Sequence, residues 1–183
     1  MPRQADPELE DRVLKAAQKL WTAGGQQSLT MRAVAKTAGT NTPAVYRRFK
    51  DRRALLRALL QRHQAALAVL IQRCQSLQEV CHCLLDYALK HPREYELIAS
   101  RIVITSHKPR PNFEYVVQKA GEWLGGEGER YRPLIIALWS LVHGTAMLLI
   151  NDVIPEHEST VRSAFKAAVE ELVRNHARLR KRR

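Results

Sequence analysis

The chain has 183 residues, of which 45% are apolar and 26% charged, a composition that excludes a disordered protein. Its formal net charge of +12 is uneven: residues 1–62 hold 13 Lys/Arg against 5 Asp/Glu, residues 63–177 hold 12 against 13, and residues 178–183 hold five cations. Because Lys and Arg near phosphates release condensed counterions, a basic head on a nearly neutral body indicates a polyanion-binding protein.

The start of the chain is polar and lacks the apolar core of a secretory signal, so we expect a cytoplasmic protein. The uncharged stretch from Leu134 to Ile150 is 17 residues long, at the short limit for a membrane span. It stands alone in a polar chain and contains Ser140, His143 and Gly144. This favours a buried helix, and no membrane partner is expected.

The first predicted helix opens the chain. Asp6-Pro7-Glu8 has the pattern of a helix start, with an N-cap residue, a proline and an acidic residue in the first turn. Apolar residues follow at helical spacing as far as Trp21, and Gly24-Gly25 ends the helix.

Two short helices are predicted next, joined by a tight turn. Thr30 can cap the first, which ends at Gly39; Thr42-Pro43 supplies a cap and an N-terminal proline for the second. Such a pair, stacked on a longer helix, is the unit that places its second helix in the DNA major groove. The inner face of the second helix carries Val45 and Phe49. Its outer face carries Asn41, Thr42, Ala44, Arg47 and Arg48, with Tyr46 and Lys50 at the flanks.

Beyond residue 50 only helices are predicted. Asp51 can cap a long helix over residues 52–73, and prolines and glycines divide the remainder into segments with helical periodicity. These further helices cover residues 76–90, 93–106, 112–124, 130–151 and 158–179. The chain is therefore predicted to be all-α with about nine helices: a three-helix helix-turn-helix head at residues 1–50 and a helical ligand-binding and dimerisation bundle at residues 51–183.

The head also carries a family resemblance. Leu29 to Gly39, followed by Val45-Tyr46-Arg47-Arg48-Phe49 and Leu55, resembles the signature of the tetracycline-repressor (TetR) family of bacterial transcriptional regulators. Thr40 and Lys50 depart from the common pattern, at positions where valine and proline are frequent. The resemblance implies a homodimeric regulator, expected to be a repressor, that binds a palindromic operator in double-stranded DNA and is released by a small apolar effector.

The resemblance also implies which residues of the head contact DNA. Arg52, for example, takes the place of the family's usual phosphate-binding lysine. The predicted set comprises Thr30, Tyr46, Arg48, Lys50 and Arg52 toward the backbone, Thr42, Pro43, Ala44 and Arg47 toward the bases, and Arg32 and Asn41 beside them.

The last two predicted helices indicate a homodimer. The helix over residues 130–151 is apolar nearly all round, so we expect a second subunit to cover one of its faces. The final helix has apolar residues along one side and charges along the other. Two such helices from each subunit would form a four-helix bundle, which would place two recognition helices ~34 Å apart, one DNA turn.

A second, shorter resemblance concerns the ligand. Residues 139–144 resemble the Trp-His-Gly block of one TetR C-terminal subgroup, and residues 91–95 resemble its helix junction. Trp139 and His143, one turn apart, are candidates for a ligand pocket, although a histidine packed in the core fits equally well. Met147 and Tyr95 are further candidates that also suit packing. No cofactor and no metal is expected.

Other functional classes are weighed against this one. No phosphate-binding loop, HExxH or Gly-x-Ser-x-Gly motif is found, so no enzyme is expected. Cys74, Cys81 and Cys83 allow a redox- or metal-sensing regulator, but their spacing fits no common zinc pattern and buried thiols explain them as well. The basic tail at residues 178–183 allows a nonspecific binder of DNA or anionic membranes, with a steep salt dependence.

Overall fold

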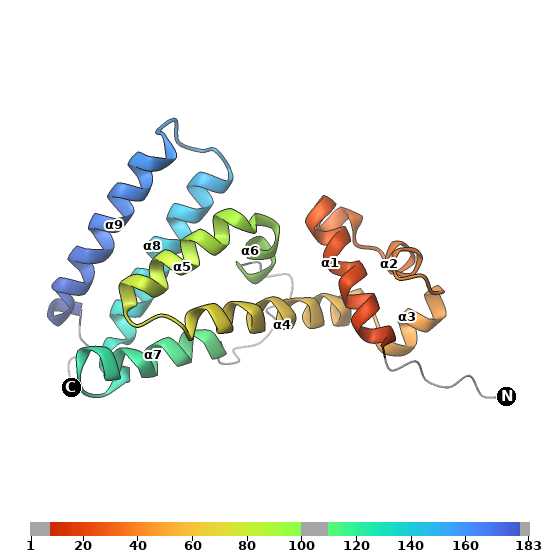
Figure 1. The fold of residues 1–183 in the computed structure, drawn as a ribbon, viewed down its shortest axis with the longest axis horizontal. Coiled ribbons are helices and arrows are strands. Elements are labelled where there is room, and N and C mark those ends of the chain that lie inside the picture. The colour runs from red at the N-terminus through yellow and green to blue at the C-terminus, as the bar shows by residue number, and fades with distance from the viewer. Residues whose placement is uncertain (1–7, 100–109, 180–183) are drawn as a thin grey trace. The chain divides into compact units, whose positions relative to one another are not determined.

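The computed structural model describes residues 8–99 and 110–179, and every regular element in these ranges is a helix (Figure 1). The predicted all-α architecture is therefore confirmed. Two 3-10 helices, η1 (Gly128–Tyr131) and η2 (His176–Leu179), accompany the α-helices. The α-helices are α1 (Leu9–Ser28), α2 (Met31–Thr37), α3 (Thr42–Arg48), α4 (Arg52–Ile71), α5 (Leu77–Lys90), α6 (Pro92–Ala99), α7 (Pro111–Leu124), α8 (Arg132–Ile150) and α9 (Glu158–Arg174).

Most predicted helix boundaries lie within a few residues of the observed ones. Helical geometry in α1 is interrupted at Gly24 and Gly25, where the helix was expected to end; Gly25 has φ +59°, a left-handed value that favours glycine. Three expectations lie outside the described residues: the helix start at Asp6-Pro7, the second half of the 93–106 helix, and the cations of the basic tail.

The described residues form two compact units. The first comprises residues 8–65 and 93–99, and the second comprises residues 66–92 and 110–179. The division falls inside α4, and α6 belongs to the first unit although it follows α5 in the chain. The expected functional boundary between residues 50 and 51 stays a prediction, since compactness does not show where DNA and ligand bind.

A single apolar cluster holds the first unit together. Trp21 of α1 and Leu97 of α6 are both buried in it. Two hydrogen bonds tie α1 to α6: the Trp21 indole donates to the Arg93 carbonyl oxygen at 2.6 Å, and the Thr22 hydroxyl donates to the buried Glu94 carboxylate at 2.6 Å. The other fully enclosed members of the cluster include Val13, Ala17, Leu29, Val34, Val45, Leu55, Leu56 and Leu59.

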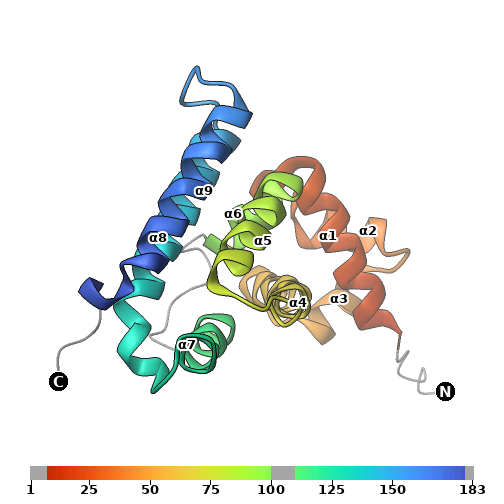
Figure 2. The same cartoon turned by 60° about the vertical axis from the view of Figure 1, so that its left-hand side comes forward.

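The second unit is built around α8. Helices α5 and α9 both pack against α8, and α8 and α9 run side by side (Figure 2). Each helix contributes apolar side chains to the interior, which is why one face of every helix in the unit is buried. The buried residues include Leu77, Val80, Cys81 and Leu85 of α5, Leu134, Ile135, Leu138, Val142 and Ala146 of α8, and Phe165, Val169 and Val173 of α9.

The α7–η1 junction requires glycine because two backbones approach closely there. A Cβ atom on Gly128 would lie 2.1 Å from the Val117 carbonyl oxygen. The hydroxyl of the buried Tyr131 lies 3.0 Å from the Leu124 carbonyl oxygen and 2.6 Å from that of Gly125. It therefore supplies a hydrogen-bond donor to carbonyl oxygens at the C-terminal end of α7, which have no partner within the helix. These contacts position the start of α8.

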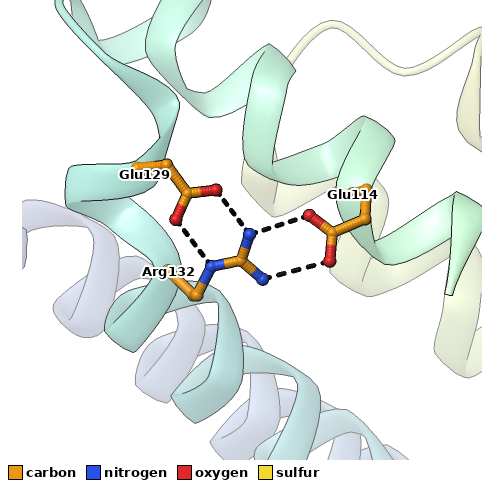
Figure 3. A network of polar contacts seen from close by, with 3 residues as sticks. All are labelled: Glu114, Glu129 and Arg132. Atoms are coloured by element: carbon orange, nitrogen blue, oxygen red, sulfur yellow. Dashed lines mark hydrogen bonds and ion pairs between the residues drawn. The ribbon is translucent and has the colours of Figure 1, made fainter. Parts of the chain in front are cut away.

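An ion-pair network reinforces the same junction (Figure 3). The Arg132 guanidinium, at the start of α8, donates to both Glu114 carboxylate oxygens, at 3.1 and 2.8 Å, and also to Glu129. These hydrogen bonds raise the pKa of Arg132 and lower that of the Glu114 carboxyl. The guanidinium therefore links α7, η1 and α8 with bidentate geometry.

Candidate DNA interface

Helices α2 and α3 form a helix-turn-helix whose turn is defined by hydrogen bonds. The Thr30 hydroxyl oxygen caps α2 by accepting from the Ala33 amide at 3.1 Å. At the other end the Thr40 amide donates to the Ala35 carbonyl at 2.9 Å around Gly39, which has φ +65°. This pattern terminates α2 sharply, and glycine is favoured at its left-handed position. The predicted roles of Thr30 as cap and Gly39 as terminator are confirmed.

Helix α3 begins with a different cap from the one expected. The Asn41 carbonyl oxygen of the side chain accepts from the Ala44 amide at 2.9 Å, so Asn41 is the N-cap and Thr42 is the first helical residue. The prediction that Thr42 caps α3 is wrong by one position, because asparagine, threonine and proline in sequence allow two overlapping starts. The Asn41 side chain is exposed, and its NH2 group is a donor that this cap does not use.

The two faces of α3 differ as a recognition helix requires. Val45 and Phe49 are buried in the core of the first unit, as predicted. Arg47 and Arg48 are exposed, and the Tyr46 side chain is 50% exposed. Ala44 was expected on the outer face but is only 4% exposed, since it is a member of the apolar cluster of the first unit; this expectation is corrected.

Arg52 has internal hydrogen-bond partners. Its Nε donates to the Leu29 carbonyl at 2.7 Å and its Nη2 donates to the Gln26 carbonyl at 2.6 Å. These bonds hold the segment that leads from the α1 break into α2. The guanidinium thus has a structural role that the sequence did not reveal, and the predicted phosphate contact of Arg52 stays a prediction.

Several cations of the head have no acidic partner among the residues that the structure describes. Arg32, Arg47 and Lys50 are exposed and form no ion pair with any residue in the described ranges. Lys36 of α2 and Arg53 of α4 are exposed and unpaired in the same sense, but sequence reasoning did not select them. A sequence gives no direct signal for such residues, since exposed lysines and arginines are common on solvated surfaces.

The residues predicted to bind a ligand belong to both units: Trp139, His143 and Met147 lie on α8 of the second unit, and Tyr95 lies on α6 of the first. Trp139 is 38% exposed on α8, where the Arg110 guanidinium lies 4.5 Å from its ring centroid and the Phe113 ring lies 5.6 Å away. His143 is exposed on the same face of α8. Tyr95 is buried in the first unit, and burial raises its pKa to about 12. The ligand roles of Trp139, His143, Met147 and Tyr95 therefore remain predictions.

The exposed face of α8 is unusually apolar for a surface. Ile136 is 49% exposed, and Trp139 and Leu148 are exposed to a similar extent. Two small exposed residues, Ser140 and Gly144, lie between them. The opposite face of α8 packs on α5 and α9, so other helices of the same subunit cover one face of this helix. That a second subunit covers the exposed face stays a prediction.

The cysteines and the apolar helix were the other features left open. Burial raises the pKa of the Cys74 thiol to about 11 and that of Cys81 to about 12. Residues 8–99 and 110–179 contain no group of three or more His, Cys, Asp or Glu side chains that could hold a metal ion. One helical segment, Gly128–Ile150, is long and apolar enough to cross a membrane, but the packed core helix of a soluble protein meets the same test.

Comparisons with known proteins agree with this architecture. The structure is similar to that of a protein with unknown function from Rhodococcus sp. RHA1 (TM-score 0.73, 19% identity, 98% of each chain covered). It is also similar to the TetR regulator SCO7222 from Streptomyces coelicolor (TM-score 0.72, 18% identity, 94% of this chain and 99% of that chain). A third similar structure is a TetR variant from Acinetobacter baumannii AYE in complex with minocycline (TM-score 0.67, 24% identity, 93% and 97%).

Matches to protein-family models assign the chain to a family, which structural similarity at low sequence identity does not do. No curated protein matches the chain. Residues 13–59 match the family described as bacterial regulatory proteins, tetR family, and residues 77–172 match the tetracyclin repressor-like C-terminal domain. Because these matches cover both the helix-turn-helix and most of the second unit, the chain belongs to the TetR family of bacterial transcriptional regulators.

Proposed function

We propose that this regulator binds a palindromic operator in double-stranded DNA as a homodimer in the cytoplasm, with α3 in the major groove. The observation that carries the proposal is the exposed outer face of α3, where Tyr46, Arg47 and Arg48 project from a helix whose opposite face is buried. Arginine reads guanine edges with two hydrogen bonds, and a tyrosine hydroxyl suits a phosphate oxygen. Arg47 is thus assigned to the bases and Tyr46 to the backbone.

The operator is tested by selection from a random duplex library with the full-length protein, followed by quantitative gel shifts. We expect a palindrome with half-sites separated by one helical turn. Arg47→Ala should weaken binding about 10- to 100-fold and relax the preference at one base pair, whereas Tyr46→Phe should weaken all sequences about equally. Lys90→Ala, which removes an exposed cation from α5, is the matched control and should bind normally. Absence of any preferred duplex would refute the proposal and favour a nonspecific basic binder.

The proposed dimer uses the exposed face of α8 together with α9. Ile136, Trp139 and Leu148 provide apolar area, while Ser140 and Gly144 on α8 allow close approach of a second helix. Burial of such a face contributes about 25 cal/mol per Å² of apolar area, which supports a lasting dimer when the interface is of the obligate size.

Sedimentation of variants tests the dimer. Ile136→Glu places a charge in the proposed interface and should yield monomers at micromolar concentration, with a matching loss of operator affinity. Val69→Glu, at an exposed apolar position of α4, is the control and should remain dimeric. If the Ile136→Glu variant remains dimeric, the exposed face of α8 is not the dimer interface.

We further propose that the protein represses transcription and that a small apolar effector releases it. Linkage sets the size of the effect: the effector lowers operator affinity by its preference for the DNA-incompetent state and by no more. Helix α4 continues from the first unit into the second, and we propose that it transmits the effect of ligand binding to the DNA-binding head. A reporter gene behind the selected operator, assayed with and without the regulator, determines the sign; higher expression with the regulator would show an activator.

A further inference from the structure

A cavity lies where the loop between α8 and α9 meets the C-terminal ends of α5 and α8. Its volume is about 380 Å³, within the range of about 300–1,000 Å³ for small-molecule sites. All residues that line it belong to the second unit. The apolar part of the lining consists of Leu89, Pro92, Leu148, Leu149, Ile150 and Ile154. Five of these side chains are half-buried and Leu148 is 38% exposed, so this α8–α9 cavity presents apolar surface to solvent.

The loop that borders the cavity is fixed at both ends by hydrogen bonds. After α8, the Asp152 amide donates to the Leu149 carbonyl oxygen at 3.3 Å, and the Val153 amide donates to that of Leu148 at 3.0 Å. Before α9, the His157 Nδ1 accepts from the Ser159 amide at 3.3 Å and caps the helix. The walls of the cavity are therefore formed before any ligand arrives, which lowers the entropic cost of binding.

The same lining carries three carboxylates and no basic residue. These are Asp152, Glu156 and Glu158. Glu158 is paired with Arg162, whose Nε donates to the carboxylate at 2.6 Å. Asp152 and Glu156 are exposed and form no ion pair with any residue in the ranges 8–99 and 110–179. The cavity thus carries two unpaired negative charges in a chain whose formal net charge is +12.

The arrangement of charge and apolar surface selects a class of ligand. The carboxylates do not suit a metal ion, because no group of three or more His, Cys, Asp or Glu among the described residues could hold one. Carboxylates at the exposed edge of an apolar wall suit a cation that carries an apolar body. The body covers the wall, while the charge stays beside the carboxylates and close to water, which avoids the cost of burying it.

We propose that the α8–α9 cavity binds a small organic cation with an apolar body, such as a quaternary ammonium or phosphonium ion. Trp139 and His143 do not line this cavity, so the site is separate from the ligand pocket considered for them. Leu148 also lies on the α8 face proposed for the dimer, and the cavity therefore opens beside that face. The proposal uses no DNA contact, so its failure would leave the proposed function intact.

Calorimetric titration of the full-length protein without DNA tests the ligand class, with tetraphenylphosphonium as the probe. We expect saturable binding at one site per subunit. Triphenylphosphine oxide has a similar body without the charge and should bind more weakly, while tetramethylammonium has the charge without the body and should not bind measurably. Raising the salt concentration from about 50 mM to about 500 mM should weaken binding of the phosphonium but not of the oxide, because salt screens exposed charges.

Variants test the place of binding. Asp152→Asn and Glu156→Gln should each weaken phosphonium binding ~2- to 5-fold, the range for exposed ion pairs, and the double variant ~5- to 20-fold. Asparagine also tolerates the left-handed conformation of residue 152, which has φ +51°, so the loop should keep its shape. Glu170→Gln removes an exposed carboxylate of α9 outside the cavity and is the matched control, which should bind like the wild type.

Methyl NMR locates the probe directly. The signals of Ile150 and Ile154 should shift during the titration, whereas that of Ile135, ~22 Å away along α8, should not. The Ile136→Glu monomer should bind as well as the dimer, since one subunit supplies the whole lining. No binding of the phosphonium, equal binding by the wild type and the double variant, equal affinity for the oxide, or binding by the monomer alone would each overturn the proposal.

Discussion

Replacement of Arg52 distinguishes its structural role in the head from its predicted contact with a DNA phosphate. The structure gives its guanidinium two internal bonds, to the carbonyl oxygens of Leu29 at 2.7 Å and Gln26 at 2.6 Å. A hydrogen bond from a charged donor contributes ~1.5–3 kcal/mol, and the lower end applies to the half-buried Leu29 bond, with less for the exposed Gln26 bond. Arg52→Ala should therefore lower the free energy of unfolding by ~2 kcal/mol, or the melting temperature by ~4–8 °C.

The assay combines chemical denaturation with amide hydrogen exchange of residues 26–31, which reports locally on the segment that Arg52 holds. Arg52→Lys should recover about half of the loss, since a single ammonium cannot span both carbonyl oxygens with the same geometry. Arg53→Ala removes the exposed neighbouring cation and should leave stability unchanged. If Arg52→Ala changes stability by less than ~0.5 kcal/mol and still abolishes DNA binding, the structural role is refuted and the phosphate role is favoured.

Three further changes follow from contacts described above. Asn41→Ala should cost ~1 kcal/mol in equilibrium unfolding through loss of the α3 cap, and Asn41→Asp should restore most of it; equal loss in both would contradict capping. Gly128→Ala should cost ~3 kcal/mol or more, because the new Cβ meets the Val117 carbonyl, whereas Gly144→Ala, with open space around it, should leave the fold of the subunit intact. Glu114 has a lowered pKa, so its contribution to stability is present above pH 4.5 and is lost as the pH falls through the folded-state value. Glu114→Gln should therefore reduce the loss of unfolding free energy on the acid side of a pH titration. An unchanged pH dependence would show that the ion pair with Arg132 contributes nothing to stability.

Local signals made much of the fold predictable. Thr30, Gly39 and Asp51 act as helix caps or terminators through hydrogen bonds with neighbours three or four residues away, as their chemistry requires; Asp51, for example, accepts from the Ala54 amide at 2.7 Å. The inward placement of Val45 and Phe49 follows from their spacing of four. Such information is contained in short stretches of chain.

The candidate site was less predictable where the answer depends on distant residues. Periodicity places Trp139 and His143 on one face of α8, but it cannot say whether a pocket, a partner subunit or solvent covers that face. The error at Ala44 has the same origin, since an alanine fits either face until the neighbouring helix is placed. The carbonyl partners of Arg52 lie 23 and 26 residues away in the chain, beyond any local pattern.

The bonds between α1 and α6 bear on how such regulators are recombined. A chimera that joins this head, within α4, to the C-terminal part of another regulator would take its α6 from that regulator. A different residue could then stand at the position of Leu97, which is fully buried in the cluster around Trp21. The Trp21 indole and the Thr22 hydroxyl would also need a carbonyl and a carboxylate at the right places in the imported helix. Transfer of DNA specificity between regulators therefore requires that α6 is transferred together with the head. Because α6 is not contiguous with the head in the sequence, it must be transferred as a second segment.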